Sequence, residues 1–142
     1  MPDISLSKAR AILRNTLKTG REMNLKPLSV VVLDAGGNVK AFEREDGASP
    51  GRFEIARGKA YGTVMTGMTG TAMMQRAEDQ AYFVNALNGA FGGQVIPVPG
   101  GVLIMDSRDR IIGAVGVTGD TSDNDAAAAL AGIEAAGLKG AA

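Results

Sequence analysis

Residues 97–125, PVPGGVLIMDSRDRIIGAVGVTGDTSDND, contain the pattern that decides the fold. Two apolar runs, 102–105 and 110–117, flank four polar residues, which is the usual pattern of a β-hairpin. The second run consists mostly of Ile, Val, Ala and Gly without polar alternation, which predicts a strand covered on both faces. An Ala-rich stretch follows the polar end of the segment, so we expect a helix capped by Thr121 or Ser122.

A second hairpin is expected earlier in the chain. The apolar run 28–33 and the run 39–44 flank a turn that reads DAGGN. The Gly-rich segment that follows residue 87 is compatible with a short strand at 94–96, and the tail 139–142 is expected to fray. Apolar residues at helical spacing predict four helices, over residues 6–23, 52–68, 72–87 and 123–136.

Strands that come in hairpins favour an antiparallel sheet with helices packed on its faces, so the predicted fold class is α+β. A parallel doubly wound sheet fits less well, because the strands here are joined by turns rather than by helices. No linker divides the 142 residues, and this length is typical of one domain. We therefore expect a single domain over residues 1–142.

The composition excludes several functions. Fifteen basic and fifteen acidic residues give a formal net charge of zero, without the basic stripe of a nucleic-acid-binding protein. No apolar run approaches the roughly 20 residues that span a membrane, and no apolar signal core is seen, so a cytoplasmic location is expected. The chain has neither Cys nor His. Proton transfer must therefore use Asp, Glu, Lys, Tyr or water, and a metal site must use oxygen ligands or Met sulfur.

Lys59 is the most informative candidate for chemistry. It lies among small residues of the expected helix 52–68, where it either reaches solvent or pairs with an acid. A desolvated lysine has a lowered pKa and can act as a base or hold an anion. Arg44 and Arg52 are close in the sequence and can clamp a carboxylate, although surface ion pairs are the commoner role of such residues.

Two further groups of residues are candidates. Gly100 and Gly101 precede a strand, where they permit a bend or let backbone N–H groups face a ligand. Asp120, Asp123 and Asp125 superficially resemble a calcium loop, but the residue order of an EF-hand and its distal Glu are missing. Capping of the last helix explains two of these acids, so we expect no metal site.

Four segments of the chain carry a resemblance to a known family. LDAGGNVKAFERED, IARGKAYGTVM, PVPGGVLI and IIGAVGVTGDTSDND resemble, in this order and spacing, the GlcG/HbpS family, also called the haem-degrading domain family. The resemblance covers residues 6–138. It implies a profilin-like α+β domain, related to the C-terminal domain of corrinoid adenosyltransferases, that assembles into homo-oligomers from dimers to octamers. It also implies a small-molecule ligand, since the family includes haem-binding proteins and proteins of catabolic operons.

The resemblance places Arg44, Asp46 and Lys59 at positions that are linked with the family's pocket. Together with Glu54 and the loop 120–125, they are expected to form a site for a small anion. Relatives that bind haem use His, and this chain has none, so the expectation is that no cofactor is bound. The iron ligands that remain conceivable are the tyrosines and four methionines, Tyr61, Tyr82, Met65, Met68, Met73 and Met74.

Two hypotheses about function follow. In the first, the protein is a cofactor-independent hydrolase, isomerase or lyase of a catabolic pathway that acts on a small organic or aromatic carboxylate. Arg44 holds the carboxylate, and Lys59 or an acid, Asp120 or Asp125, moves protons. Backbone N–H groups near Gly100 and Gly101 stabilise developing negative charge. In the second hypothesis, the protein is a non-catalytic module that binds or senses haem or a corrinoid.

Overall fold

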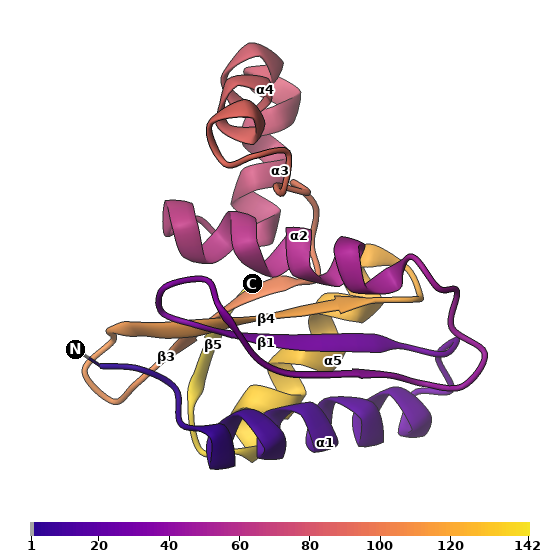
Figure 1. The fold of residues 1–142 in the computed structure, drawn as a ribbon. Coiled ribbons are helices and arrows are strands. Elements are labelled where there is room, and N and C mark those ends of the chain that lie inside the picture. The colour runs from indigo at the N-terminus through magenta and orange to yellow at the C-terminus, as the bar shows by residue number, and fades with distance from the viewer. Residues whose placement is uncertain (1) are drawn as a thin grey trace.

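The computed structural model describes residues 2–142. Over these residues it has five helices and one antiparallel sheet of five strands in the order β2-β1-β4-β3-β5 (Figure 1). The predicted α+β class and both predicted hairpins are confirmed. The elements are α1 (Leu6–Glu22), β1 (Ser29–Asp34), β2 (Val39–Arg44), α2 (Arg52–Thr66), α3 (Gly70–Asp79), α4 (Ala81–Ala90), β3 (Gly101–Met105), β4 (Ile111–Thr118), α5 (Ser122–Ala135) and β5 (Lys139–Ala141).

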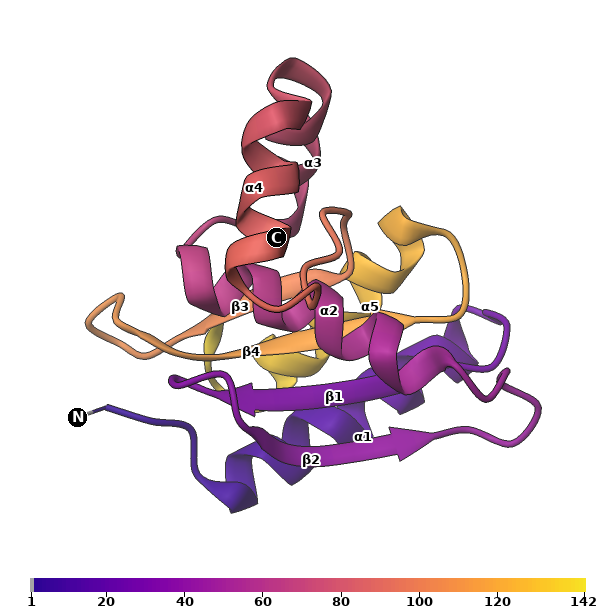
Figure 2. The same cartoon turned by 45° about the horizontal axis from the view of Figure 1, so that its top comes forward.

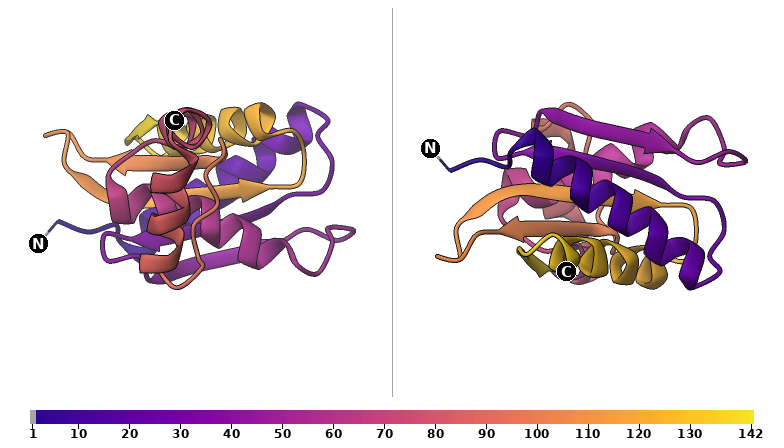
Figure 3. Two further views of the ribbon diagram at one scale, coloured as in Figure 1. Left: turned by 90° about the horizontal axis from the view of Figure 1, so that it is seen from above. Right: turned by 90° about the horizontal axis from the view of Figure 1, so that it is seen from below.

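The sheet is the middle of three layers. Helices α1 and α5 lie side by side on one face, and α2 lies on the other (Figure 3). Successive residues of a strand point to opposite faces, so Val30 and Val32 contact the α1–α5 layer while Val31 and Leu33 contact α2. Strand β4 is buried from Ile112 onward, as its unbroken apolar run predicts.

Helices α3 and α4 form a hairpin that projects from the body above α2 (Figures 1 and 2). The prediction of one helix over residues 72–87 is wrong, because the chain reverses at Gln80, which has φ −140° and ψ 64°. The reversal lets the two helices pack against each other, and no Gly or Pro marks it in the sequence. The cap of α3 is Thr69, whose hydroxyl accepts a hydrogen bond from the Ala72 amide.

Two other expectations are wrong because of the hydrogen bonds that the backbone forms. The tail is ordered as β5, which pairs with β3 at Met105 and gives that strand a second neighbour. Residues 94–96 form no strand, because their amides bond elsewhere. The Val95 amide donates to the side chain of Asn88 (2.9 Å), and the Ile96 amide donates to the carbonyl of Gly58 (3.1 Å).

Glycines set the distance between α2 and the sheet. A Cβ atom at Gly116 of β4 would overlap the Ala56 carbonyl of α2, and one at Gly101 of β3 would overlap the Lys59 carbonyl. These glycines of the sheet therefore allow the backbone of α2 to approach it closely. This packing brings the side chain of Lys59 to the end of β4.

Gly89 offers a test of helix propensity in the projecting hairpin. It lies in α4, is exposed, and an added Cβ would meet nothing within 4 Å. Gly89→Ala is expected to raise the free energy of unfolding by about 0.5–1 kcal/mol, because Ala restricts the unfolded chain and favours the helix. Urea denaturation measures the change, and a loss of stability would show that another surface covers this position.

Candidate functional site

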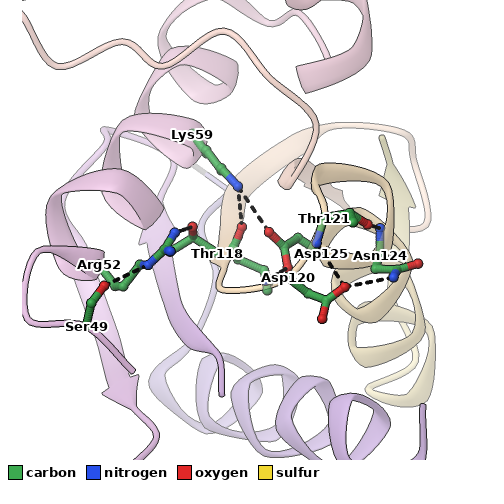
Figure 4. A network of polar contacts seen from close by, with 9 residues as sticks. Ser49, Arg52, Lys59, Thr118, Asp120, Thr121, Asn124 and Asp125 are labelled. Atoms are coloured by element: carbon green, nitrogen blue, oxygen red, sulfur yellow. Dashed lines mark hydrogen bonds and ion pairs between the residues drawn. The ribbon is translucent and has the colours of Figure 1, made fainter. Parts of the chain in front are cut away.

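A buried ion pair joins α2, β4 and α5. The side chain of Lys59 is 5% exposed and that of Asp125, in the first turn of α5, is 1% exposed. Lys59 Nζ lies 3.2 Å from Asp125 Oδ2 and donates to the Val117 carbonyl at 3.0 Å (Figure 4). Asp125 Oδ1 accepts a hydrogen bond from the Asp120 amide at 3.0 Å. Both charges are therefore held between three elements that are far apart in the sequence.

Burial moves the pKa values of the two partners towards each other. Desolvation lowers the pKa of Lys59, and the charge of Asp125 opposes this effect only in part. Desolvation likewise raises the pKa of Asp125 against the opposing charge of Lys59. The energy needed to move a proton between the two groups falls as their pKa values approach, so the pair is suited to holding and transferring one proton.

Arg52 covers the outer side of this pair. Its Nη1 donates to Thr118 Oγ1 at 2.9 Å, and its Nε donates to Ser49 Oγ at 3.0 Å (Figure 4). The Arg52 charge also contributes to the lowered pKa of Lys59. Because Ser49 is exposed and Thr118 is 1% exposed, the guanidinium spans the distance from the surface to the buried end of β4.

A row of polar residues crosses three strands beside Arg52. Ser29 of β1 lies directly opposite Arg44 of β2 and Thr118 of β4, so all three point to the face that α2 covers. Ser29 is fully buried, and its hydroxyl has no hydrogen-bond partner within residues 2–142. Arg44 donates to the Ala48 carbonyl at 2.7 Å. The row thus combines one cationic side chain, Arg44, with a buried hydroxyl that has no partner within the described residues.

The carboxylate of Asp120 is held in place by hydrogen bonds from neighbouring residues. Its carboxylate accepts hydrogen bonds from the Asn124 side chain (2.8 Å) and from the amides of Lys26 (3.0 Å) and Thr121 (2.9 Å). These donors, with Asn124 the strongest, lower the pKa of Asp120 to about 2. A carboxylate with so low a pKa is a poor proton carrier near neutral pH.

Asn124→Ala should raise the pKa of Asp120 towards 3.8, since the largest cause of its lowering is removed. A carboxyl whose pKa is lowered on folding stabilises the protein above the unfolded value and loses that effect as pH falls. In the variant this contribution should be smaller, and its loss, which still begins near the unfolded value of 3.8, should be complete at a higher pH. Carboxyl ¹³C NMR titration measures the pKa, and a value still near 2 in the variant would contradict the assignment.

The structure brings some of the predicted site residues together. Gly100, with φ +114°, packs on the side chain of Lys59, where an added Cβ would lie 2.9 Å from Cδ and 3.0 Å from Nζ. Gly101 lies against the Lys59 carbonyl. Asp120 and Asp125 adjoin the same lysine through the start of α5.

The other predicted residues line different hollows. Arg44 and Asp46 border an open groove of about 550 Å³ between the C-terminal part of α1 and the end of β2, together with Arg21. Glu54 lines a small cavity of about 130 Å³ between α2 and the loop after α4. The eight predicted residues therefore do not share one pocket in this conformation. Ser29 and Thr118 were missed because each stands at the end of an apolar run and reads as part of a strand.

The tyrosines and methionines give a poor fit to haem within one chain. Tyr61 and Met65 are half-buried and meet over Gly37, where an added Cβ would lie 2.7 Å from Met65 Cε and 3.0 Å from the Tyr61 ring. Tyr82 is 73% exposed, whereas Met73 is buried. The two larger grooves, of about 550 and 520 Å³, are lined by neither residue type.

None of the helices within residues 2–142 is long and apolar enough to cross a membrane.

Comparisons with known proteins agree with the fold. The family model described as "Haem degrading protein HbpS-like" matches residues 4–134. The structure of a PduOC:heme complex is similar with a TM-score of 0.84 and 20% identity, covering 96% of each chain. Klebsiella pneumoniae protein ORFY gives 0.84 and 23%, covering 96% of this chain and 92% of its own. A double mutant of Streptomyces reticuli HbpS gives 0.80 and 22%, covering 94% and 87%. The comparison with curated protein sequences gives no match.

Proposed function

The chain belongs to the HbpS-like family of haem degrading proteins, and from this premise we propose that it binds a small organic carboxylate at the buried end of β4. In this proposed site Lys59 and Asp125 are the buried residues, and Arg52 and Arg44 lie nearer the surface. The reaction class that these residues suit is proton transfer next to a carboxylate, as in a cofactor-independent isomerase, lyase or hydrolase.

The observation that carries the proposal is an unpaired buried hydroxyl near two arginine side chains. Arg52 bonds to Thr118 at the end of β4, Lys59 is paired there with Asp125, and Arg44 lies two strands away, opposite Ser29. The buried Ser29 hydroxyl between Arg44 and Thr118 has no partner within the described residues. A ligand carboxylate would supply an acceptor for that hydroxyl and for the N–H groups of the arginines.

Each residue has a separate task in this proposal. Lys59 is nearly inaccessible, so a ligand reaches it only after Arg52 leaves Thr118 and Ser49. Arg52 and Arg44 then bind the carboxylate, as planar guanidinium groups do well. The Lys59–Asp125 pair accepts or returns the proton, and backbone N–H groups near Gly100 and Gly101 face the developing negative charge.

Arg52→Met is expected to weaken carboxylate binding by about 10- to 100-fold, because one charged hydrogen-bonding group is lost. Calorimetric titration with a panel of small aliphatic and aromatic carboxylates measures the effect. Arg14→Met is the matched control, since Arg14 is exposed on α1 and lies outside the site. Equal affinities in wild type and Arg52→Met would contradict the proposal, as would binding of no carboxylate in the panel.

Haem binding is the second candidate. The likeness to a PduOC:heme complex favours it, as does the description of the family. Tyr61 and Met65 are the half-buried pair that could contribute iron ligands, and neither lines the two larger grooves. Titration with haemin separates the two candidates. A stoichiometric Soret shift that is abolished by Tyr61→Phe would favour haem, and its absence would favour the carboxylate site.

We propose that the projecting hairpin of α3 and α4 is the surface that contacts a second copy of the chain. Helix α4 has no charged residue, and its Tyr82 is exposed. An uncharged helix is best covered by a surface like itself, as in a symmetric dimer interface. Tyr82→Glu should therefore lower the molar mass measured by light scattering, and an unchanged mass would place the interface elsewhere.

A further inference from the structure

A small cavity separate from the Lys59 cluster lies between α2 and the loop that follows α4. It measures about 130 Å³, and its lining consists of Glu54, Arg57, Gly58, Gly93 and Gln94. The loop is fixed in place, since the Ile96 amide bonds to the Gly58 carbonyl at 3.1 Å. The cavity is therefore bounded by ordered backbone on both sides.

Two buried polar atoms of this lining have no hydrogen-bond partner within residues 2–142. They are Nε of Arg57, which is a donor, and Oε1 of Gln94, which is an acceptor. The Arg57 guanidinium lies over the Tyr61 ring, 5.7 Å from its centroid, a contact that favours this orientation. Buried donors and acceptors are nearly always paired in folded proteins, so the two atoms mark a place where a bound group completes the bonding.

We propose that this cavity binds a small, singly charged oxyanion that also carries a hydroxyl group, such as a short 2-hydroxy carboxylate or hydrogencarbonate. The carboxylate oxygen accepts from Arg57 Nε, and the hydroxyl donates to Gln94 Oε1. A volume of about 130 Å³ equals the share of about four waters in the liquid, which suits a ligand of roughly four to six non-hydrogen atoms.

Glu54 adds a limit on charge. Its exposed carboxylate belongs to the lining of the same cavity, and it forms no ion pair within 4 Å among the described residues. Arg57 offsets one negative charge on the ligand, whereas Glu54 repels each negative charge, so a second one would be unfavourable. The site should accordingly favour monoanions over dicarboxylates of similar size.

The test compares L-lactate with propionate, which lacks only the hydroxyl. Titrations use full-length protein carrying Arg52→Met, so that the carboxylate site proposed at the end of β4 binds more weakly and its contribution can be separated. Lactate is expected to bind at least ten-fold more tightly than propionate, because without the hydroxyl Gln94 stays unpaired. Gln94→Leu should abolish this preference, whereas Gln75→Leu, on exposed α3, should preserve it. Equal affinities for lactate and propionate in the Arg52→Met protein would overturn the proposal.

Arg57→Lys gives a second readout that keeps the positive charge. It removes Nε as a fixed donor and should weaken lactate and propionate together, leaving their ratio unchanged. A crystal structure of the wild-type protein grown with lactate should show the ligand between Arg57 and Gln94. Ordered waters alone in the cavity at saturating lactate would overturn the proposal, independently of what happens at the Lys59 site.

Discussion

Lys59→Met is expected to lower the free energy of unfolding by about 3–5 kcal/mol, because it leaves the Asp125 carboxylate buried without its partner. Asp125→Asn should cost a similar amount, since it leaves the ammonium of Lys59 buried alone. The double variant Lys59→Met/Asp125→Asn should be much more stable than the sum of the single effects predicts, because no uncompensated charge remains. Urea denaturation of the four proteins completes the cycle.

The two single variants should also respond to pH in opposite directions. In Asp125→Asn, Lys59 loses the charge that raises its pKa, so the folded protein binds this proton more weakly than the unfolded chain does. Stability then rises as pH increases towards 10.5. In Lys59→Met, the pKa of Asp125 rises further above 3.8, so the folded protein binds the proton more tightly and stability falls as pH increases.

An exposed ion pair provides the control for this cycle. Lys139 and Asp109 lie 2.6 Å apart with side chains that are 54% and 71% exposed. Lys139→Met should change stability by less than about 1 kcal/mol, because solvent screens such pairs. If Lys59→Met proved as mild as Lys139→Met, or if both single variants had the same pH slope, the buried pair would not have the role described here.

Gly116→Ala is the second substitution with a large expected effect, a loss of about 3 kcal/mol or more. The new Cβ would overlap the Ala56 carbonyl, which belongs to the backbone of α2 and cannot rotate away as a side chain can. The whole helix must therefore move from the sheet. This movement should also lengthen the contact between Lys59 and Asp125, so carboxylate binding should weaken together with stability.

Gly89→Ala is the matched control, since it adds the same methyl group where nothing lies within 4 Å. The comparison of the two variants by thermal and urea denaturation isolates the packing effect from the general effect of replacing glycine. A Gly116→Ala protein with wild-type stability would mean that α2 is not in close contact with β4. The position assigned to Lys59 would then also be wrong.

The hairpins and the helix ends could be predicted because their signals are local. Ser5 caps α1 and Thr121 caps α5, each through its hydroxyl, and Gly137 ends α5 with φ +82°. The break at Gln80 could not be predicted, since it depends on the packing of α3 against α4. The same holds for β5, which is a strand only because the edge of β3 lies beside it.

In the candidate site, too, the contacts between residues that are distant in the sequence could not be predicted. The small neighbours of Lys59 in the sequence left both solvent exposure and a buried ion pair open, and its partner, Asp125, lies 66 residues away. Nothing local distinguishes Asp125, with its raised pKa, from Asp120, whose pKa is about 2. Arg44 and Asp46 follow each other closely in the chain, yet they border a groove at the edge strand rather than the cavity of Glu54. The single domain over 1–142 and the cytoplasmic location stay predictions.

The pKa of Lys59, measured by ¹³C NMR of protein labelled at lysine Cε, tests the central claim most directly. The account predicts a value below 10.5 in the free protein, and a rise when a small carboxylate saturates the site, because the added negative charge stabilises the ammonium. A value of 10.5 that does not move on addition of the carboxylate would contradict it.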